Sequence, residues 1–560
     1  MHTSSLEKLI ASNLRITYAI VTWVTLAIIA VYFLPALLRM DLYTDDMRQH
    51  ISWYYSYRDP ELFQHDLLKT FYADTFLVVG FKSLYSLGSR IIDPQVLGEL
   101  LAVALALVTA VLAYAIGKNV TNGSQLGGIA NVLLFLFGSV VNINYMIPLA
   151  GGLQRSFALP ILLLGILSLL GQNFVALSLA LLLAALFYPP SFISLCIYSS
   201  LIIGVHFFNT KKIPKGIYLL LAVVTVCFSL LIWMQRHSSH EASVWTPYSL
   251  REALNMVEFK ADGLIPILFS NWWLYISHAL PALGIPLTLF LSSCLLMYFL
   301  PRGLTIFRLE ASTIIMSAWI NYAFAYLLFF RLYEPNRYVL YPFLAFWLLV
   351  FPPLFLKLVE FLDKLYYQRN KYLIISRKQV LTILFVLVLG VTLSSTILVS
   401  IRVVKGQGGM IGTVPTELYN FVKLLPKNTL IAAHPRDADD IPMRSQRSVL
   451  VMEKSFYPSH KEFYEEIKAR AFSIWAAMYA TDPQPILHLQ QKYGVDVFLV
   501  NRQMYKEDPM QAKPFISMIK SLQSSLGERQ PLLLSPPKEA VLYAKGDFSL
   551  VDLKKLITHS

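Results

Sequence analysis

Long apolar runs separated by short polar stretches make up the first 403 residues of the chain. A transmembrane helix needs about 20 predominantly apolar residues, and on that measure we count about eleven runs. Their centres lie near residues 28, 107, 135, 163, 181, 200, 225, 291, 320, 347 and 391. The pattern therefore predicts a polytopic α-helical membrane domain over residues 1–403.

The pattern changes in residues 404–560, where apolar runs of strand length are interrupted by amphipathic segments. The runs TLIAAHP, RSVLVMEK, VDVFLVNR and AVLYAKG are rich in β-branched residues, and SHKEFYEEIKARAFSIWAAMYA has helical spacing. This alternation predicts a small α/β domain. The segment contains no Gly-rich phosphate fingerprint, so we expect no nucleotide binding.

Lys and Arg in the short loops indicate the orientation of the chain. The basic loops near Lys211, Arg302 and Lys378 fall on one side when the predicted helices alternate, and such loops mark the cytoplasm. We therefore expect a plasma (inner) membrane protein with a cytoplasmic N-terminus. An odd number of crossings places residues 404–560 in the periplasm or its equivalent, together with a first outer loop over residues 39–96.

Composition supports a membrane protein and excludes other classes. Hydrophobic residues make up 56% of the chain and charged residues 14%, whereas about a quarter of an average soluble domain is charged. The net charge of +13 comes from loops between apolar runs, so we expect no nucleic-acid partner. The three cysteines lie within apolar runs, so we expect no disulfide.

Candidate chemistry begins in the first outer loop, at YTDDMRQHISWYY. A helix from Thr44 or Asp45 toward Tyr57 places Asp46 and His50 on one face, with Trp53 beyond them. A partly desolvated carboxylate can have a raised pKa, which suits a general base. The alternative is that the acidic pair only caps the helix and that the aromatic residues form an interfacial belt.

Arginines at the outer ends of apolar helices are the second candidate feature, because the orientation rule concentrates Lys and Arg in the cytoplasm. Arg155 lies in AGGLQRSFALP, and Arg331, Arg337 and Tyr338 lie in FFRLYEPNRYVLYP. A guanidinium group can bind a phosphate through two parallel hydrogen bonds. The alternative for each arginine is snorkelling to water or to lipid headgroups.

Acidic residues and arginines on one side of a membrane suit a lipid-linked phosphate ester. Displacement of a sugar from a polyprenyl phosphate needs positive charge for the leaving phosphate and one base for the acceptor hydroxyl. We expect Asp45 or Asp46 to be that base, and inversion at the anomeric carbon. His50 and Trp53 would shape the side that receives an extracytoplasmic acceptor, which is a glycan, a lipid or a protein.

Two further groups are candidate metal ligands. His65, Asp66 and Asp74 in FQHDLLKTFYAD could complete a site with Asp46 and His50, or could lie on an amphipathic helix in the membrane interface. The tail segment HPRDADD, which contains His434, Asp437, Asp439 and Asp440, could mimic a metal loop. We favour a solvated turn there, because the glycine and the final glutamate of a calcium loop are missing.

With these motifs, the chain resembles the GT-C superfamily of polytopic glycosyltransferases, which includes oligosaccharyltransferases and protein O-mannosyltransferases. The resemblance covers nearly the whole architecture and is most specific at Asp45 and Asp46, directly after the first helix. It implies that an acidic residue acts as base or binds a divalent cation such as Mg²⁺ or Mn²⁺, and that the donor is polyprenyl-linked. The tail is similar to the outer domains of bacterial members of unknown specificity.

The sequence also departs from that superfamily. It has no WWDYG-like motif, since NWWLYISH shares only the tryptophans, and its acidic pair is Asp-Asp and not Asp-Glu. Neither an asparagine acceptor nor a particular sugar can therefore be carried over. Alternatives that remain open are a flippase for lipid-linked sugars, a polysaccharide polymerase or ligase with a diphosphate-linked donor, and a non-catalytic scaffold.

Overall fold

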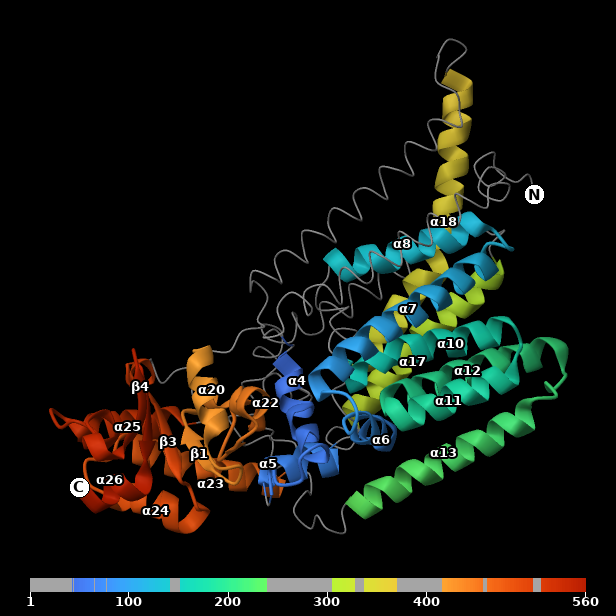
Figure 1. Ribbon diagram of the computed structural model, residues 1–560. Coiled ribbons are helices and arrows are strands. Elements are labelled where there is room, and N and C mark those ends of the chain that lie inside the picture. The colour runs from blue at the N-terminus through green and yellow to red at the C-terminus, as the bar shows by residue number, and fades with distance from the viewer. Residues whose placement is uncertain are drawn as a thin grey trace.

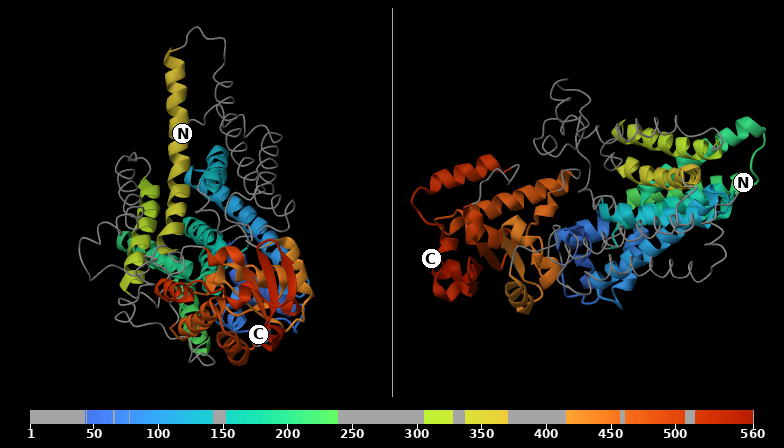
Figure 2. Two further views of the ribbon diagram at one scale, coloured as in Figure 1. Left: turned by 90° about the vertical axis from the view of Figure 1, so that its left-hand side faces the viewer. Right: turned by 90° about the horizontal axis from the view of Figure 1, so that it is seen from above.

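The computed structural model describes residues 43, 45–64, 66–76, 78–141, 152–238, 305–327, 337–369, 415–456, 461–506 and 515–559. Within these ranges the chain forms a bundle of apolar helices and a smaller α/β domain, with the first outer loop between them (Figures 1 and 2). The apolar helices are α7 (Pro94–Val120), α8 (Gln125–Val141), α10 (Ala158–Leu170), α11 (Phe174–Phe187), α12 (Pro189–Thr210), α13 (Ile217–Ser238), α17 (Thr305–Leu327) and α18 (Arg337–Arg369).

Each of these helices coincides with one of the predicted apolar runs, and the runs near residues 28, 291 and 391 lie outside the described residues. By length and composition, three of the described helices can cross a membrane: α7, α12 and the part of α18 from Arg337 to Glu360. Helices α10 and α11 have only 13 and 14 residues. They are short because a turn at Gly171–Asn173, with Gln172 at positive φ, divides one long apolar stretch.

Close helix contacts and buried amides organise the bundle. A Cβ atom on Gly117 of α7 would lie 2.5 Å from the carbonyl oxygen of Gly127 in α8, so the two backbones approach as only glycine permits. The Asn131 side chain of α8 donates hydrogen bonds to the carbonyls of Ala113 in α7 and Leu348 in α18, at 2.9 and 2.8 Å. The three helices therefore pack as one unit.

Helix α18 extends beyond the rest of the bundle. Its 33 residues correspond to about 50 Å, whereas the hydrocarbon core of a bilayer is about 30 Å thick. Figure 1 shows its far half rising past the ends of the neighbouring helices. Arg337 is its first residue, and the charge of Arg337 acts on Asp46 of the first outer loop.

The C-terminal part is an α/β domain, as its pattern predicts. Its five-stranded sheet has the order β2-β1-β3-β5-β4. Strands β2, β1 and β3 are parallel to one another, and β5 is antiparallel to both of its neighbours, β3 and β4. The strands are β1 (Leu430–Ala433), β2 (Ser448–Val449), β3 (Val497–Asn501), β4 (Val541–Lys545) and β5 (Phe548–Asp552). The longer helices are α20 (Thr416–Leu424), α23 (Lys461–Met478), α24 (Gln484–Tyr493), α25 (Ile516–Leu526) and α26 (Leu553–His559).

The first outer loop folds into a compact cluster of short helices. They are α4 (Asp45–His50), η1 (Ser52–Tyr57), α5 (Leu67–Lys69), η2 (Thr70–Phe76) and α6 (Val79–Gly88). The helix expected up to Tyr57 is thus an α-helix continued by a 3-10 helix, and it ends before Pro60 as the sequence predicts.

This cluster packs against the C-terminal domain. The Phe71 ring of η2 is fully buried and stacks on Phe463 of α23, with ring centroids 3.7 Å apart. The prediction that this segment lies in the membrane interface is therefore wrong for η2, because its apolar face is covered by protein. The contact also puts the first outer loop and the C-terminal domain at the same end of the bundle.

Candidate functional site

An ion pair between two distant segments forms the centre of the site. The Asp46 carboxylate of α4 accepts from the Arg155 guanidinium, which the short helix η4 (Gln154–Phe157) holds at the start of α10. Both side chains remain partly accessible, with 23% and 22% of their surfaces exposed. Two residues that the sequence singled out for base and phosphate chemistry are thus in direct contact.

The pKa of Asp46 is lowered, contrary to our expectation of a raised value. Burial alone would raise it, but nearby positive charges, those of Arg155, Lys454 and Arg337 among them, outweigh burial. The carboxylate is therefore ionised at neutral pH. Arg337, the first residue of α18, is close enough for its charge to act on Asp46 and His50.

His50 is neutral at pH 7, since burial lowers its pKa to about 4 despite the opposing charge of Asp46. Its ring packs edge-on against Tyr72, with centroids 5.8 Å apart. Trp53, expected on the acceptor side, is fully buried, and its Nε1–H donates to the carbonyl of Gln49 at 2.7 Å. In this structure Trp53 supports the helix and is not available for direct contact with a ligand.

The remaining predicted residues have different positions. Tyr338 follows Arg337 in α18 and is buried, with 2% of its surface exposed. Arg331, His65 and the side chains of Asp45 and Asp74 lie outside the described residues. Of the predicted site residues, the described structure therefore brings together Asp46, His50, Arg155 and Arg337.

Of the expected metal ligands Asp46, His65 and Asp66, the structure describes only Asp46 and Asp66, so the complete site stays a prediction. Asp66 caps α5, and its Oδ1 accepts from the backbone N–H groups of Leu68 at 2.7 Å and Lys69 at 3.2 Å. Asp46 is paired with Arg155. Within the described ranges, no three His, Cys, Asp or Glu side chains are arranged to hold a metal ion. We therefore derive no step through a metal.

The acidic segment of the C-terminal domain is not a solvated turn, so that prediction is wrong. Asp437, Asp439 and Asp440 are buried, with at most 1% of the surface of each residue exposed. Asp440 accepts from the Tyr43 hydroxyl at 2.6 Å and pairs with Arg48 at 3.3 Å. Asp439 also pairs with Arg48, at 3.3 Å, while burial raises its pKa to about 8. These acids join the C-terminal domain to α4.

A lysine that the sequence did not single out also lies at the site. The turn η6 (Glu453–Ser455) contacts the first outer loop, and the carbonyl of Lys454 accepts from Tyr72 Oη at 2.7 Å and from Gln49 Nε2 at 3.3 Å. The positive charge of Lys454 acts on both Asp46 and His50. No local pattern could reveal this contact, because 405 positions separate Gln49 from Lys454.

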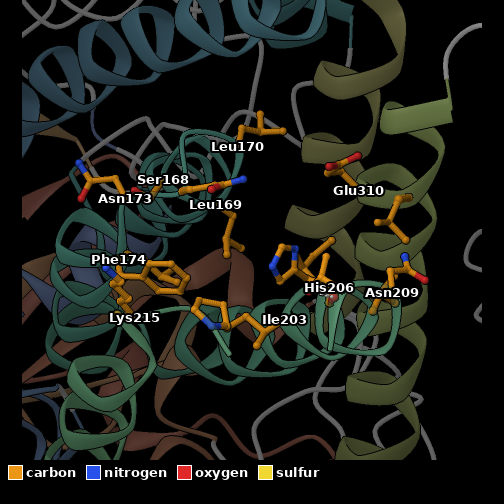
Figure 3. A pocket seen from close by; sticks show the side chains of 18 of the residues that line it. Ser168, Leu169, Leu170, Asn173, Phe174, Ile203, His206, Asn209, Lys215 and Glu310 are labelled. Atoms are coloured by element: carbon orange, nitrogen blue, oxygen red, sulfur yellow. Dashed lines mark hydrogen bonds between the residues drawn. The ribbon is translucent and has the colours of Figure 1, made fainter. Parts of the chain in front are cut away.

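A hollow lies at the end of the bundle away from the first outer loop. Its volume is about 700 Å³, and Figure 3 shows Glu310, His206, Lys215 and Phe174 around it. Asn119 and Asn122, at the C-terminal end of α7, also line it. The opposite end of α7 meets the first outer loop through Asp93, which accepts from the Tyr55 hydroxyl at 3.2 Å. The hollow is therefore separate from the site around Asp46.

Comparison with known proteins gives only distant likenesses. No protein-family model matches the chain, and no curated protein matches it. The apo structure of the Archaeoglobus fulgidus oligosaccharyltransferase is 11% identical, covers 87% of this chain and 70% of its own, and has a TM-score of 0.46. The same archaeal enzyme with an inhibitory peptide and a dolichol-phosphate is 11% identical, with coverages of 88% and 70% and a TM-score of 0.46.

The complex of that enzyme with Zn and sulfate is 10% identical, with coverages of 87% and 68% and a TM-score of 0.43. All three TM-scores lie below 0.5. The geometry of the site in this chain, and not the likeness, therefore supports the function proposed next.

Proposed function

We propose that the protein is an integral-membrane glycosyltransferase that transfers a sugar from a polyprenyl-phosphate-linked donor to an extracytoplasmic acceptor, with inversion. The observation that carries the proposal is the convergence of Arg155 and Arg337 on the first-loop carboxylate Asp46. These cations stand at the starts of apolar helices, where a lipid-linked phosphate would arrive from the bilayer.

The arginines supply the charge that the leaving group requires. As the bond between the anomeric carbon and the phosphate oxygen breaks, negative charge develops on that oxygen, and a guanidinium placed beside it stabilises the transition state. Arg337 opens α18, and a helix N-terminus also favours an anion. No general acid is needed, because a phosphate leaves as an anion.

Asp46 is proposed as the base, and its pairing with Arg155 makes its basicity depend on the donor. Without donor, the cations around it keep its pKa low, which makes it a weak base. When a donor phosphate forms an ion pair with Arg155, its negative charge offsets that of the guanidinium, and the Asp46 carboxylate is stabilised less. The pKa of Asp46 then rises toward a value suited to accepting a proton. The acceptor hydroxyl would be deprotonated efficiently only while the donor is bound.

The other predicted residues keep more general roles in the proposal. Asp45 is a second acidic candidate, Arg331 is a further phosphate candidate, and Tyr338 supports the start of α18. Neutral His50 can accept or donate one hydrogen bond to the acceptor. We keep the plasma (inner) membrane as the location, with the C-terminal domain outside, a bound divalent cation as an untested alternative, and membrane lipids as partners.

The test is sugar transfer from radiolabelled polyprenyl-phosphate sugars by the full-length protein in proteoliposomes. We expect Asp46→Asn to lower the rate at least about 100-fold, since a positioned base contributes 10²–10⁴-fold. Asp59→Asn is the matched control, because this carboxylate lies in the same loop but pairs with the exposed Lys427 at 2.6 Å, away from the site.

Equal transfer by wild type and Asp46→Asn would overturn the role of Asp46. If labelled lipid crosses the bilayer at equal rates in both while no donor is consumed, the protein is a flippase. Consumption of a diphosphate-linked donor alone would identify a polymerase or ligase.

A further inference from the structure

The C-terminal domain contributes to the site through one turn, η6, whose backbone is fixed by the first outer loop. Lys454 accepts two hydrogen bonds at its carbonyl, from Tyr72 and Gln49, and donates one from its N–H to Asp439 Oδ1 at 3.2 Å. Gln49 directly precedes His50 in α4, and the Tyr72 ring packs edge-on against the His50 ring. The backbone of Lys454 is therefore held against α4, which carries Asp46 and His50, and against η2, which contains Tyr72.

This backbone lies against α4, the helix that carries Asp46 and His50, through the hydrogen bond that Gln49 Nε2 donates to the Lys454 carbonyl at 3.3 Å. The charge of Lys454 acts on Asp46 and on His50, the same two groups on which Arg155 and Arg337 act. Three cations from three parts of the chain thus share one neighbourhood. A lysine ammonium is a compact point charge on a flexible stem, which suits a ligand that arrives and leaves.

We propose that Lys454 of the C-terminal domain is a third phosphate-binding cation, so that this domain completes the donor site formed by Arg155 and Arg337. The proposal rests on the proposed function, because the phosphate is that of the polyprenyl-linked donor. It gives the C-terminal domain a part in donor binding, in addition to any contact with the acceptor.

The test is binding of undecaprenyl phosphate to the full-length protein in detergent, measured by native mass spectrometry and by ligand-induced thermal stabilisation. A charge-assisted hydrogen bond corresponds to about tenfold in affinity, so we expect Lys454→Met to weaken binding about tenfold. Lys454→Arg should recover most of the affinity. Lys427→Met is the matched control, since Lys427 also connects the two parts of the chain, through Asp59 and Glu61, but is exposed.

The outcomes separate this inference from the proposed function. Wild type without affinity for undecaprenyl phosphate would overturn both. Wild-type affinity retained in Lys454→Met would overturn the role of Lys454 alone. An equal loss in Lys427→Met would show that the effect comes from attachment of the domain, and would also overturn the inference. Loss in Lys454→Met together with recovery in Lys454→Arg supports it.

Discussion

Burial sets the protonation states of the side chains at the junction of the two parts. It lowers the pKa of His50 to about 4 and that of His434 to about 3, so both imidazoles are neutral at pH 7. In His434, the neutral Nδ1 accepts from the N–H of Arg436 at 3.3 Å and caps α21 (Pro435–Ala438). That cap helps to position the acidic segment that follows.

The burial of His434 makes stability depend on pH in a defined direction. Between about pH 6.5 and the folded pKa of about 3, the unfolded chain binds a proton at His434 and the folded chain does not. The free energy of unfolding therefore falls as the pH falls through this window. The variant His434→Asn keeps a hydrogen-bond acceptor but has no group that titrates. We expect its melting temperature to fall less than that of wild type when the pH is lowered from about 7 to about 5. Equal losses would contradict this role.

At the scale of single residues, the sequence predicts which side chains belong to the site better than it predicts their contacts. Asp46, His50 and Arg155 could be selected because their types, and the side of the membrane that the sequence predicts for them, suit the chemistry. The low pKa of Asp46 could not be predicted, since it depends on the charges of Arg155, Arg337 and Lys454, which lie far from it in the sequence. The burial of Asp437, Asp439 and Asp440 was missed because their only local signal, a run of polar residues, is also that of a solvated turn.

Among the elements, the apolar helices and most of the strands follow from local patterns. Strand β5 was not predicted, because FSLVD is short and alternates weakly, and it forms by pairing with β3 and β4. The lengths of α10 and α11 also depend on context, since one turn divides a continuous apolar stretch. Local spacing thus predicts where helices lie better than where they end.

The contact between α7 and α8 gives a prediction at the element scale. Gly117→Ala would place a Cβ atom 2.5 Å from the carbonyl oxygen of Gly127, and we expect it to destabilise the protein by about 1–3 kcal/mol. Gly204→Ala in α12 is the control: its Cβ would have no neighbour within 4 Å, so a gain of up to about 1 kcal/mol is expected. Thermal unfolding in detergent measures both, and equal shifts would exclude a role for the close approach.

On the scale of the whole molecule, the first outer loop is the joint between the bundle and the C-terminal domain. Arg48 pairs with Asp440, whose side chain is 2% exposed, while Lys427 forms exposed pairs. Buried charges that lose their partner are costly, whereas exposed pairs contribute little. The joint therefore depends on Arg48 far more than on Lys427.

We expect Arg48→Met to destabilise the attachment of the C-terminal domain by about 3 kcal/mol, and Lys427→Met to change it by less than about 1 kcal/mol. Limited proteolysis of the full-length protein in detergent measures this as faster release of the C-terminal domain from Arg48→Met. If both variants release it at the wild-type rate, the buried pair of Arg48 and Asp440 does not hold the joint.

The joint also imposes an order on biosynthesis. Tyr43 and Asp440, which are hydrogen-bonded in the folded protein, are 397 positions apart. At about 5–20 residues per second, the ribosome adds Asp440 about 20–80 s after Tyr43. Throughout that interval Phe71 of η2 lacks the ring of Phe463 on which it stacks in the folded protein. The joint can therefore form only after the part of the C-terminal domain that contains Asp440 and Phe463 has been translated.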